Sequence, residues 1–188
     1  MDELPNEQVE HAEHAQHAVH EGNSFLITVS ATIAVLAVGA AIVASFETLE
    51  SGAAISEKND AVLKQNQASD QWSYYQAKSI KQNMYAIAAV GAGSKQGDFT
   101  EQALRYDEEG KEIKKKAEEL EHERDEKLAA GDSHEARHHA LTLAATLVHV
   151  GIAVATIAII SRGQRWPWYC AIVLGAAGAA KTAWTYLV

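Results

Sequence analysis

The chain contains very little cysteine and proline. Its 188 residues include one cysteine, Cys170, and two prolines, Pro5 and Pro167. A single cysteine excludes an intrachain disulfide and a zinc site built from cysteines. Because no proline lies between Pro5 and Pro167, nothing in that stretch forbids very long helices.

Positive charge is also scarce. The chain has 16 Lys and Arg against 25 Asp and Glu, which gives a formal net charge of −9. Residues 1–24 carry six acids and no Lys or Arg. This balance argues against nucleic acid as a partner, because phosphates require a basic face. It also argues against polybasic docking onto anionic lipid.

Three long apolar runs are what the chain does have. Residues 25–46 carry no charge, and as a helix they would extend about 33 Å, enough to cross a bilayer core of about 30 Å. Residues 140–160 and 166–188 are similar, and aromatic residues bracket the last run. The pattern predicts an all-α membrane protein with three transmembrane helices, so the lipid bilayer is its first expected partner.

The polar segment between the first two runs predicts an antiparallel helical hairpin outside the membrane. Residues 91–98, with three glycines, form the expected tip, and Asp98 is the expected cap of the second arm. Ser51-Gly52 and Gly131-Asp132-Ser133 are expected to loosen or break the helices. Both arms show a heptad pattern of small, polar and aromatic residues: Ala54, Ala61, Ala68 and Tyr75, then Phe99, Ala103, Tyr106, Gly110, Ile113, Ala117, Leu120 and Arg124. The expected division is an acidic His-rich tail (1–24), transmembrane helix 1 (25–46), the hairpin (47–139), transmembrane helix 2 (140–160), an Arg-containing loop (161–165) and transmembrane helix 3 (166–188).

Several residues are candidates for contact with a second copy or a membrane-protein partner. Trp72, Tyr75 and Ile80 with Met84 are interpreted as one apolar strip on the first arm. The alternative is that the aromatic rings pack inside the hairpin. On the third run, small residues recur every four positions and suit close helix contact: Ala171, Gly175, Ala179 and Ala183. We therefore expect a homo-oligomer or a subunit of a larger assembly.

One motif suggests an enzyme. His134, Glu135 and His138 match the H-E-x-x-H pattern of zinc metalloproteases, in which two histidines on one helix face hold the metal. A zinc site of this kind needs a third protein ligand, and only His149 follows, inside the second run. We therefore expect no metal, no cofactor and no enzymatic activity, with a membrane metalloprotease as the alternative.

Ionisable residues within the apolar runs suggest a further alternative. His149 and Lys181 lie at similar distances from the turn between the last two runs, and His149 stands on a stripe with Thr142 and Thr146 that should face protein. A small transporter or channel would use such groups. Lys181 is also near enough to the end of its run to reach the membrane surface. Histidines recur every third residue in the tail, HAEHAQHAVH, where metal binding and pH sensing stay open.

A resemblance supports the three-span plan. The block AVLKQNQASDQWSYYQAKSIKQNMY, residues 61–85, is similar to the signature region of domain-of-unknown-function family 4337, bacterial membrane proteins. The order of elements from about Phe25 onward also fits. The resemblance implies a bacterial membrane location and three spans, and it implies no activity.

The sequence thus predicts a membrane-anchored helical scaffold or interaction subunit. Arg162 and Arg165 in the short loop favour the cytoplasmic side for that loop and the N-terminal tail. The hairpin is then expected in the periplasm, with the spans in the bacterial inner membrane.

Overall fold

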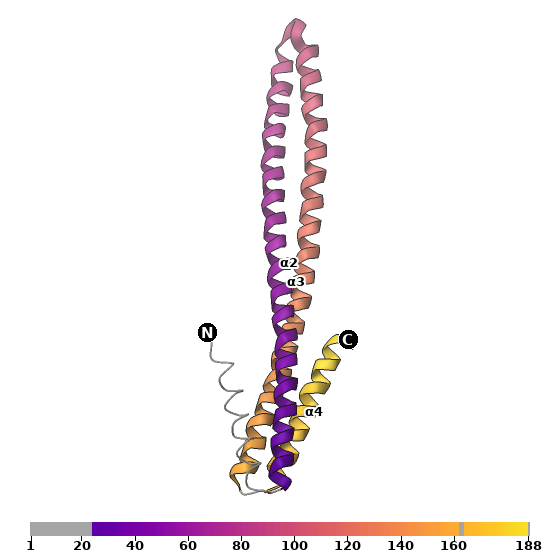
Figure 1. Ribbon diagram of the computed structural model, residues 1–188. Helices are drawn as coiled ribbons and strands as arrows, with labels where there is room; N and C mark the ends of the chain where they lie inside the picture. The colour runs from indigo at the N-terminus through magenta and orange to yellow at the C-terminus, as the bar shows by residue number, and fades with distance from the viewer. Residues whose placement is uncertain (1–23, 162–163, 188) are drawn as a thin grey trace. The chain divides into compact units, whose positions relative to one another are not determined.

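The described part of the protein is helical. The structure, a computed structural model, describes residues 24–161 and 164–187. These form α2 (Ser24–Val90), a short 3-10 helix η1 (Gly93–Lys95), α3 (Gln96–Ile160) and α4 (Trp166–Leu187), as Figure 1 shows. The expected His-rich tail lies outside the described residues except for Ser24.

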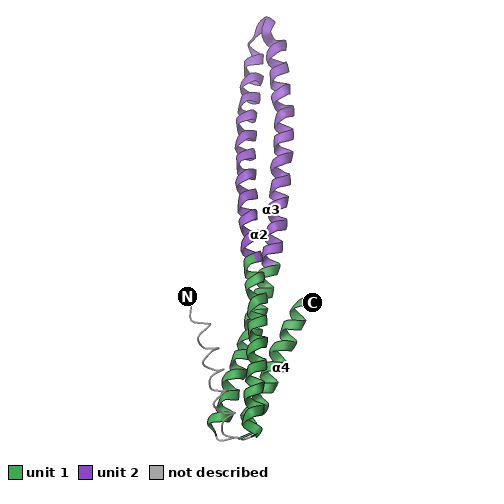
Figure 2. Cartoon of the chain, in the orientation of Figure 1, with its two compact units in different colours: residues 1–52, 133–188 green, residues 53–132 purple. Residues whose placement is uncertain are grey.

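The chain divides into two compact units, coloured separately in Figure 2. Unit 1 contains residues 1–52 and 133–188, and unit 2 contains residues 53–132. Helices α2 and α3 each contribute to both units, whereas α4 belongs to unit 1 alone.

Both long helices continue through the interruptions predicted from the sequence. Helix α2 is unbroken at Ser51-Gly52, and α3 is unbroken at 131–133. Gly131 is buried, and a Cβ there would lie 2.9 Å from Lys58 Cγ, so packing between the arms compensates for its low helix propensity. At the tip the chain turns at Gly93, whose φ of 53° suits glycine, and α3 begins at Gln96 rather than at Asp98.

The core of unit 1 is built from small and β-branched residues of all three helices. Helix α4 approaches its neighbours at glycines: a Cβ at Gly178 would lie 2.9 Å from the carbonyl oxygen of Ala144, and one at Gly151 would lie 3.1 Å from that of Ala171. Such short approaches let backbones pack without a hydrophobic driving force between helices. The main cluster of buried residues comprises Val29, Ile33, Ala40, Val148, Ile152, Ala155, Ala158 and Ala171.

In unit 2 the two arms pack through small buried residues and are connected by hydrogen bonds and ion pairs. The two arms run antiparallel, because Trp72 lies by Glu121 and Gln82 by Asp107. Lys64 pairs with Glu123 at 2.5 Å, a partly exposed contact. The buried residues along the arms are Ala54, Ala61, Ala68, Ala89, Ala103, Gly110, Ala117 and Gly131. Because alanine buries little area, the hydrogen bonds and ion pairs between the arms contribute much of the specificity of this pairing.

Two helices are long and apolar enough to cross a membrane. They are α2 and α3, each with an apolar stretch of sufficient length. Helix α4 is not among the membrane-crossing candidates found in the described residues.

Candidate functional site

The most concentrated cluster of polar side chains in unit 1 begins just after the first apolar run. Glu47 and Glu50 are three residues apart on α2 and therefore share one face. His134 and His138 are four apart on α3 and share a face in the same way. The two faces meet, and each carboxylate lies opposite one histidine.

Glu50 is the centre of this cluster and is 9% exposed. One oxygen lies 2.6 Å from His134 Nδ1, the other accepts a hydrogen bond of 3.1 Å from the Tyr186 hydroxyl, and Arg137 Nη1 is 3.9 Å away. Burial raises the pKa of this carboxyl, but the hydrogen bonds from His134 and Tyr186 and the charge of Arg137 outweigh it and leave the pKa below its ordinary value. Glu50 is therefore an ionised carboxylate that ties all three helices of unit 1 together.

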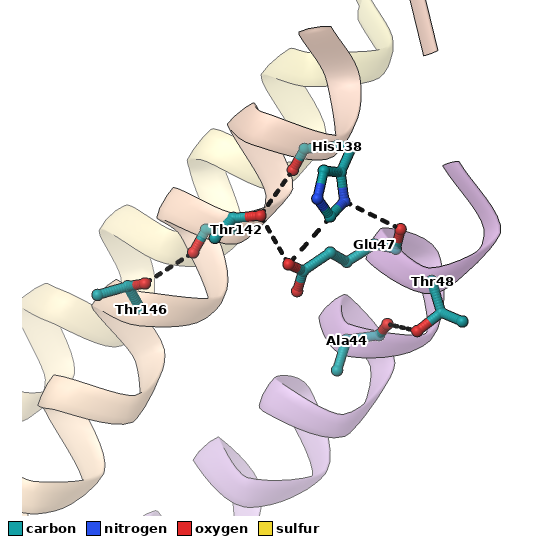
Figure 3. A network of polar contacts seen from close by, with 6 residues as sticks. All are labelled: Ala44, Glu47, Thr48, His138, Thr142 and Thr146. Atoms are coloured by element: carbon teal, nitrogen blue, oxygen red, sulfur yellow. Dashed lines mark hydrogen bonds and ion pairs between the residues drawn. The ribbon is translucent and has the colours of Figure 1, made fainter. Parts of the chain in front are cut away.

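Glu47 forms the second half of the cluster, shown in Figure 3. Its carboxylate accepts a hydrogen bond of 2.6 Å from Thr142 and lies 4.0 Å from His138 Nδ1. The same nitrogen is 3.3 Å from the Glu47 carbonyl oxygen. Since a carbonyl oxygen only accepts hydrogen bonds, Nδ1 of His138 is the donor in this contact.

This geometry gives the H-E-x-x-H motif a role between helices. His134 and His138 each turn Nδ1 toward a group on α2, and Glu135, also partly buried, lies between them in sequence. Within residues 24–161 and 164–187 no three His, Cys, Asp or Glu side chains are grouped to hold a metal. The arrangement can fix the register of α2 on α3.

Sequence reasoning missed Glu47, Glu50, Arg137 and Tyr186. The sequence contains a signal for this cluster. Glu47 and Glu50, three residues apart, follow the first apolar run, and His134 and His138, four residues apart, precede the second. In antiparallel helices those two positions come to the same level.

The aromatic block lies in unit 2. Trp72 and Tyr75 are partly buried, their rings meet edge to face at 5.7 Å, and Trp72 Nε1 donates to Glu121 at 2.8 Å. Tyr74 is 51% exposed. Ile80 and Met84 are exposed at 60% and 64%, so the predicted single strip of Trp72, Tyr75, Ile80 and Met84 is wrong. At 100° per residue Ile80 points about 140° away from Tyr75, which explains the separation.

The predicted contact residues of the last helix have different surroundings. Gly175 is buried within the chain, where a Cβ would lie 2.3 Å from Leu36 Cδ2 of α2. Ala179 is exposed and lines an apolar groove with Gly39 and Phe46. The role of both residues in association between copies stays a prediction.

His149 and Lys181 do not share a depth, contrary to the expectation. Gly178 packs on Ala144 and Val148, and since α4 runs antiparallel to α3, Lys181 lies level with residues near Leu143. His149 is then about 9 Å further along α3. His149 and Thr146 are exposed, so their stripe does not face protein within a single chain.

These features define a class: an all-helical protein with two helices able to cross a membrane, a polar cluster beside their apolar stretches, and a separate unit of paired polar arms. The chain belongs to the family described as Domain of unknown function (DUF4337), whose model matches residues 25–188. The resemblance noted in residues 61–85 is therefore confirmed. No curated protein and no solved structure matches the chain.

Proposed function

We propose that the chain is a multi-pass scaffold or interaction subunit of the bacterial inner membrane, without catalytic activity of its own. Residues 25–46, 140–160 and 166–188 would be its three spans. The apolar stretches of α2 and α3 support the first two, and the aromatic residues at both ends of α4, Trp166 and Tyr186 among them, suit a third.

One observation carries the interaction role. On α2 in unit 2, outside the apolar stretches, Ile80, Met84 and Ile87 are 60%, 64% and 74% exposed. Their spacing of four and three residues places them on one helix face, and Ala77 extends the same stripe. Exposed apolar stripes of this kind on water-facing helices mark association surfaces.

The proposed occupant of this stripe is a second copy of the chain. The spacing of three and four residues is that of a coiled-coil seam, which requires a helix of matching pattern. Copies anchored in one bilayer with the same orientation present the stripe at the same distance from the membrane, so registers match without further adjustment.

An apolar groove in unit 1 supports the same occupant. It has a volume of about 560 Å³ and is lined by the small residues Gly39, Ala179 and Ala183 together with Ile42 and Phe46. Small residues allow the backbone of a neighbouring helix to approach closely within a membrane. A helix of a second copy fits this requirement.

The test is the mass of the full chain in mild detergent. We expect more than one copy for the wild type and a shift toward one copy for Ile80→Ser combined with Ile87→Ser. The matched control is Leu104→Ser with Leu128→Ser, which removes residues of α3 that are 61% and 40% exposed. A strictly monomeric wild type, or equal effects of both pairs, would contradict the proposal.

A second comparison tests the groove. Ala179→Leu should weaken association, whereas Ala180→Leu, also exposed but outside the groove lining, should not. Equal masses for these two variants would remove the groove from the interface.

Orientation is tested separately at the tip. Ser94 is exposed beside Gly93, so Ser94→Cys in a Cys170→Ser background presents a single accessible thiol. We expect a membrane-impermeant reagent to label it from the periplasm. Labelling only after the inner membrane is opened would place the hairpin in the cytoplasm.

A further inference from the structure

Unit 1 contains a cavity of about 520 Å³ between α3 and the end of α4. Two cationic side chains, Arg137 and Lys181, line it together with the hydroxyl residues Ser133 and Thr185 and the indole of Trp184. Ala140 adds an apolar surface. The cavity thus combines positive charge, hydrogen-bond donors and apolar area in one place.

The positive charge of the cavity is incompletely neutralised. Arg137 is 3.9 Å from Glu50, whose carboxylate is also occupied by His134 and Tyr186. The Lys181 ammonium makes no hydrogen bond or ion pair with the described residues 24–161 and 164–187, whereas the Lys181 carbonyl oxygen accepts a hydrogen bond of 2.9 Å from the Thr185 hydroxyl. A partly buried ammonium that pairs with no Asp or Glu carboxylate of the described residues favours an anionic ligand.

The position of the cavity along the helices restricts the source of that anion. Ala140 is the first residue of the apolar run 140–160, and Lys181 lies level with residues near Leu143. Trp184 is 62% exposed and lines the cavity together with Tyr186, an arrangement typical of the membrane surface. If the run is in the bilayer, the cavity lies at the depth of lipid headgroups.

We propose that this cavity binds the phosphate of an anionic phospholipid. Arg137 and Lys181 would contact the phosphate oxygens, the Ser133 hydroxyl would donate a hydrogen bond, and the apolar surface at Ala140 would contact the start of the acyl chains. The site is a specific pocket and requires no polybasic surface. This inference rests on the membrane location proposed above.

The test uses the full chain in detergent with equal amounts of a phosphatidylglycerol and a phosphatidylcholine of the same acyl chains, counted by native mass spectrometry. We expect the anionic lipid to be bound preferentially. Lys181→Gln and Arg137→Gln should each lower this preference roughly fivefold, and Lys181→Arg should keep it. Arg165→Gln is the matched control. It also removes one positive charge, but this charge directly precedes Trp166, at the end of α4 opposite the cavity.

Two further experiments distinguish the possible outcomes. An unchanged lipid preference in Lys181→Gln would overturn the site, as would displacement of the lipid by inorganic phosphate at equal concentration, because a free anion would then be its ligand. Each variant is also expressed in cells and its membranes are washed at alkaline pH. Release of the wild type by this wash would refute the membrane location, whereas retention with no lipid preference would refute the lipid site alone.

Discussion

The two units use the same two long helices in different ways. In unit 1 the outward side chains are largely apolar, such as Val35 at 71% and Val38 at 62% exposure, and the helices approach each other at glycines. In unit 2 charged residues cover the arms, and ion pairs such as Lys64–Glu123 and Lys127–Glu57 connect them. A helix that is apolar on all sides suits lipid, and a helix with a polar surface suits water. Each long helix therefore changes its preferred solvent along its length.

The largest expected effect concerns close packing in unit 1. Gly178→Ala places a Cβ 2.9 Å from a backbone oxygen of Ala144 and 2.6 Å from Val148 Cγ2. Because backbone cannot move aside as a side chain can, we expect a loss of about 3 kcal/mol, the upper part of the overpacking range. Thermal unfolding in detergent, followed by circular dichroism, measures it.

Gly175→Ala is the control for that prediction. Its nearest contact is Leu36 Cδ2, the end of a flexible side chain that can turn away. We expect a clearly smaller loss, and a loss at Gly175 equal to that at Gly178 would contradict the proposed packing of α4.

The next effect concerns the polar cluster. Glu50→Gln weakens hydrogen bonds with His134 and Tyr186, and bonds to a charged group contribute about 1.5–3 kcal/mol. The pKa of Glu50 is lowered in the folded chain, so its stabilisation is complete above the ordinary value of 4.5 and is lost as pH falls below it. The difference in melting temperature between wild type and variant should therefore shrink as the pH falls below 4.5.

Glu119→Gln provides the control for the charge change. Its side chain is 61% exposed on unit 2, and we expect an effect within about 0.5 kcal/mol. A variant at Glu50 whose deficit stays the same well below pH 4.5 would contradict the role of the ionised carboxylate.

These residues also show what the sequence alone could reveal. The heptad positions of Ala54, Ala61 and Ala68 were predicted, because a period of seven is visible within a single stretch of sequence, and all three residues are buried. The partnership of Glu50 with His134 was not predicted, since it depends on the register between distant segments. Which face of α4 is buried within the chain was not predicted, because an Ala-rich helix has small residues on every side and the neighbouring helices determine which of them become buried.

A smaller effect is expected for the aromatic block of unit 2. Trp72 is only partly buried, so Trp72→Ala should cost about 1–2 kcal/mol, below the 3–5 kcal/mol of a fully buried ring. Trp72→Phe keeps an aromatic ring but removes the donor to Glu121, so its difference from the wild type mainly reports that hydrogen bond, and its difference from Trp72→Ala reports the packing of the ring. Equal melting temperatures for Trp72→Ala and the wild type would show that the ring does not stabilise the paired arms.

The smallest effect has the opposite sign and sharpens the contrast between the units. At Gly110 in unit 2 a Cβ would lie 3.6 Å from the Tyr75 ring, an ordinary contact. Gly110→Ala should therefore stabilise the chain by about 0.5–1 kcal/mol through helix propensity. The same measurement as for Gly178→Ala applies, and a loss at Gly110 as large as at Gly178 would mean that both units pack alike.

The most direct test of the account asks what covers the exposed apolar side chains. Val38 in unit 1 and Leu104 in unit 2 are 62% and 61% exposed in the isolated chain. Each is replaced by cysteine in the Cys170→Ser background, and native membranes opened to reagent on both sides are treated with a water-soluble maleimide. We predict rapid labelling of Leu104→Cys and protection of Val38→Cys until detergent is added. Equal labelling of both positions before detergent would contradict the claim that unit 1 lies in lipid while unit 2 lies in water.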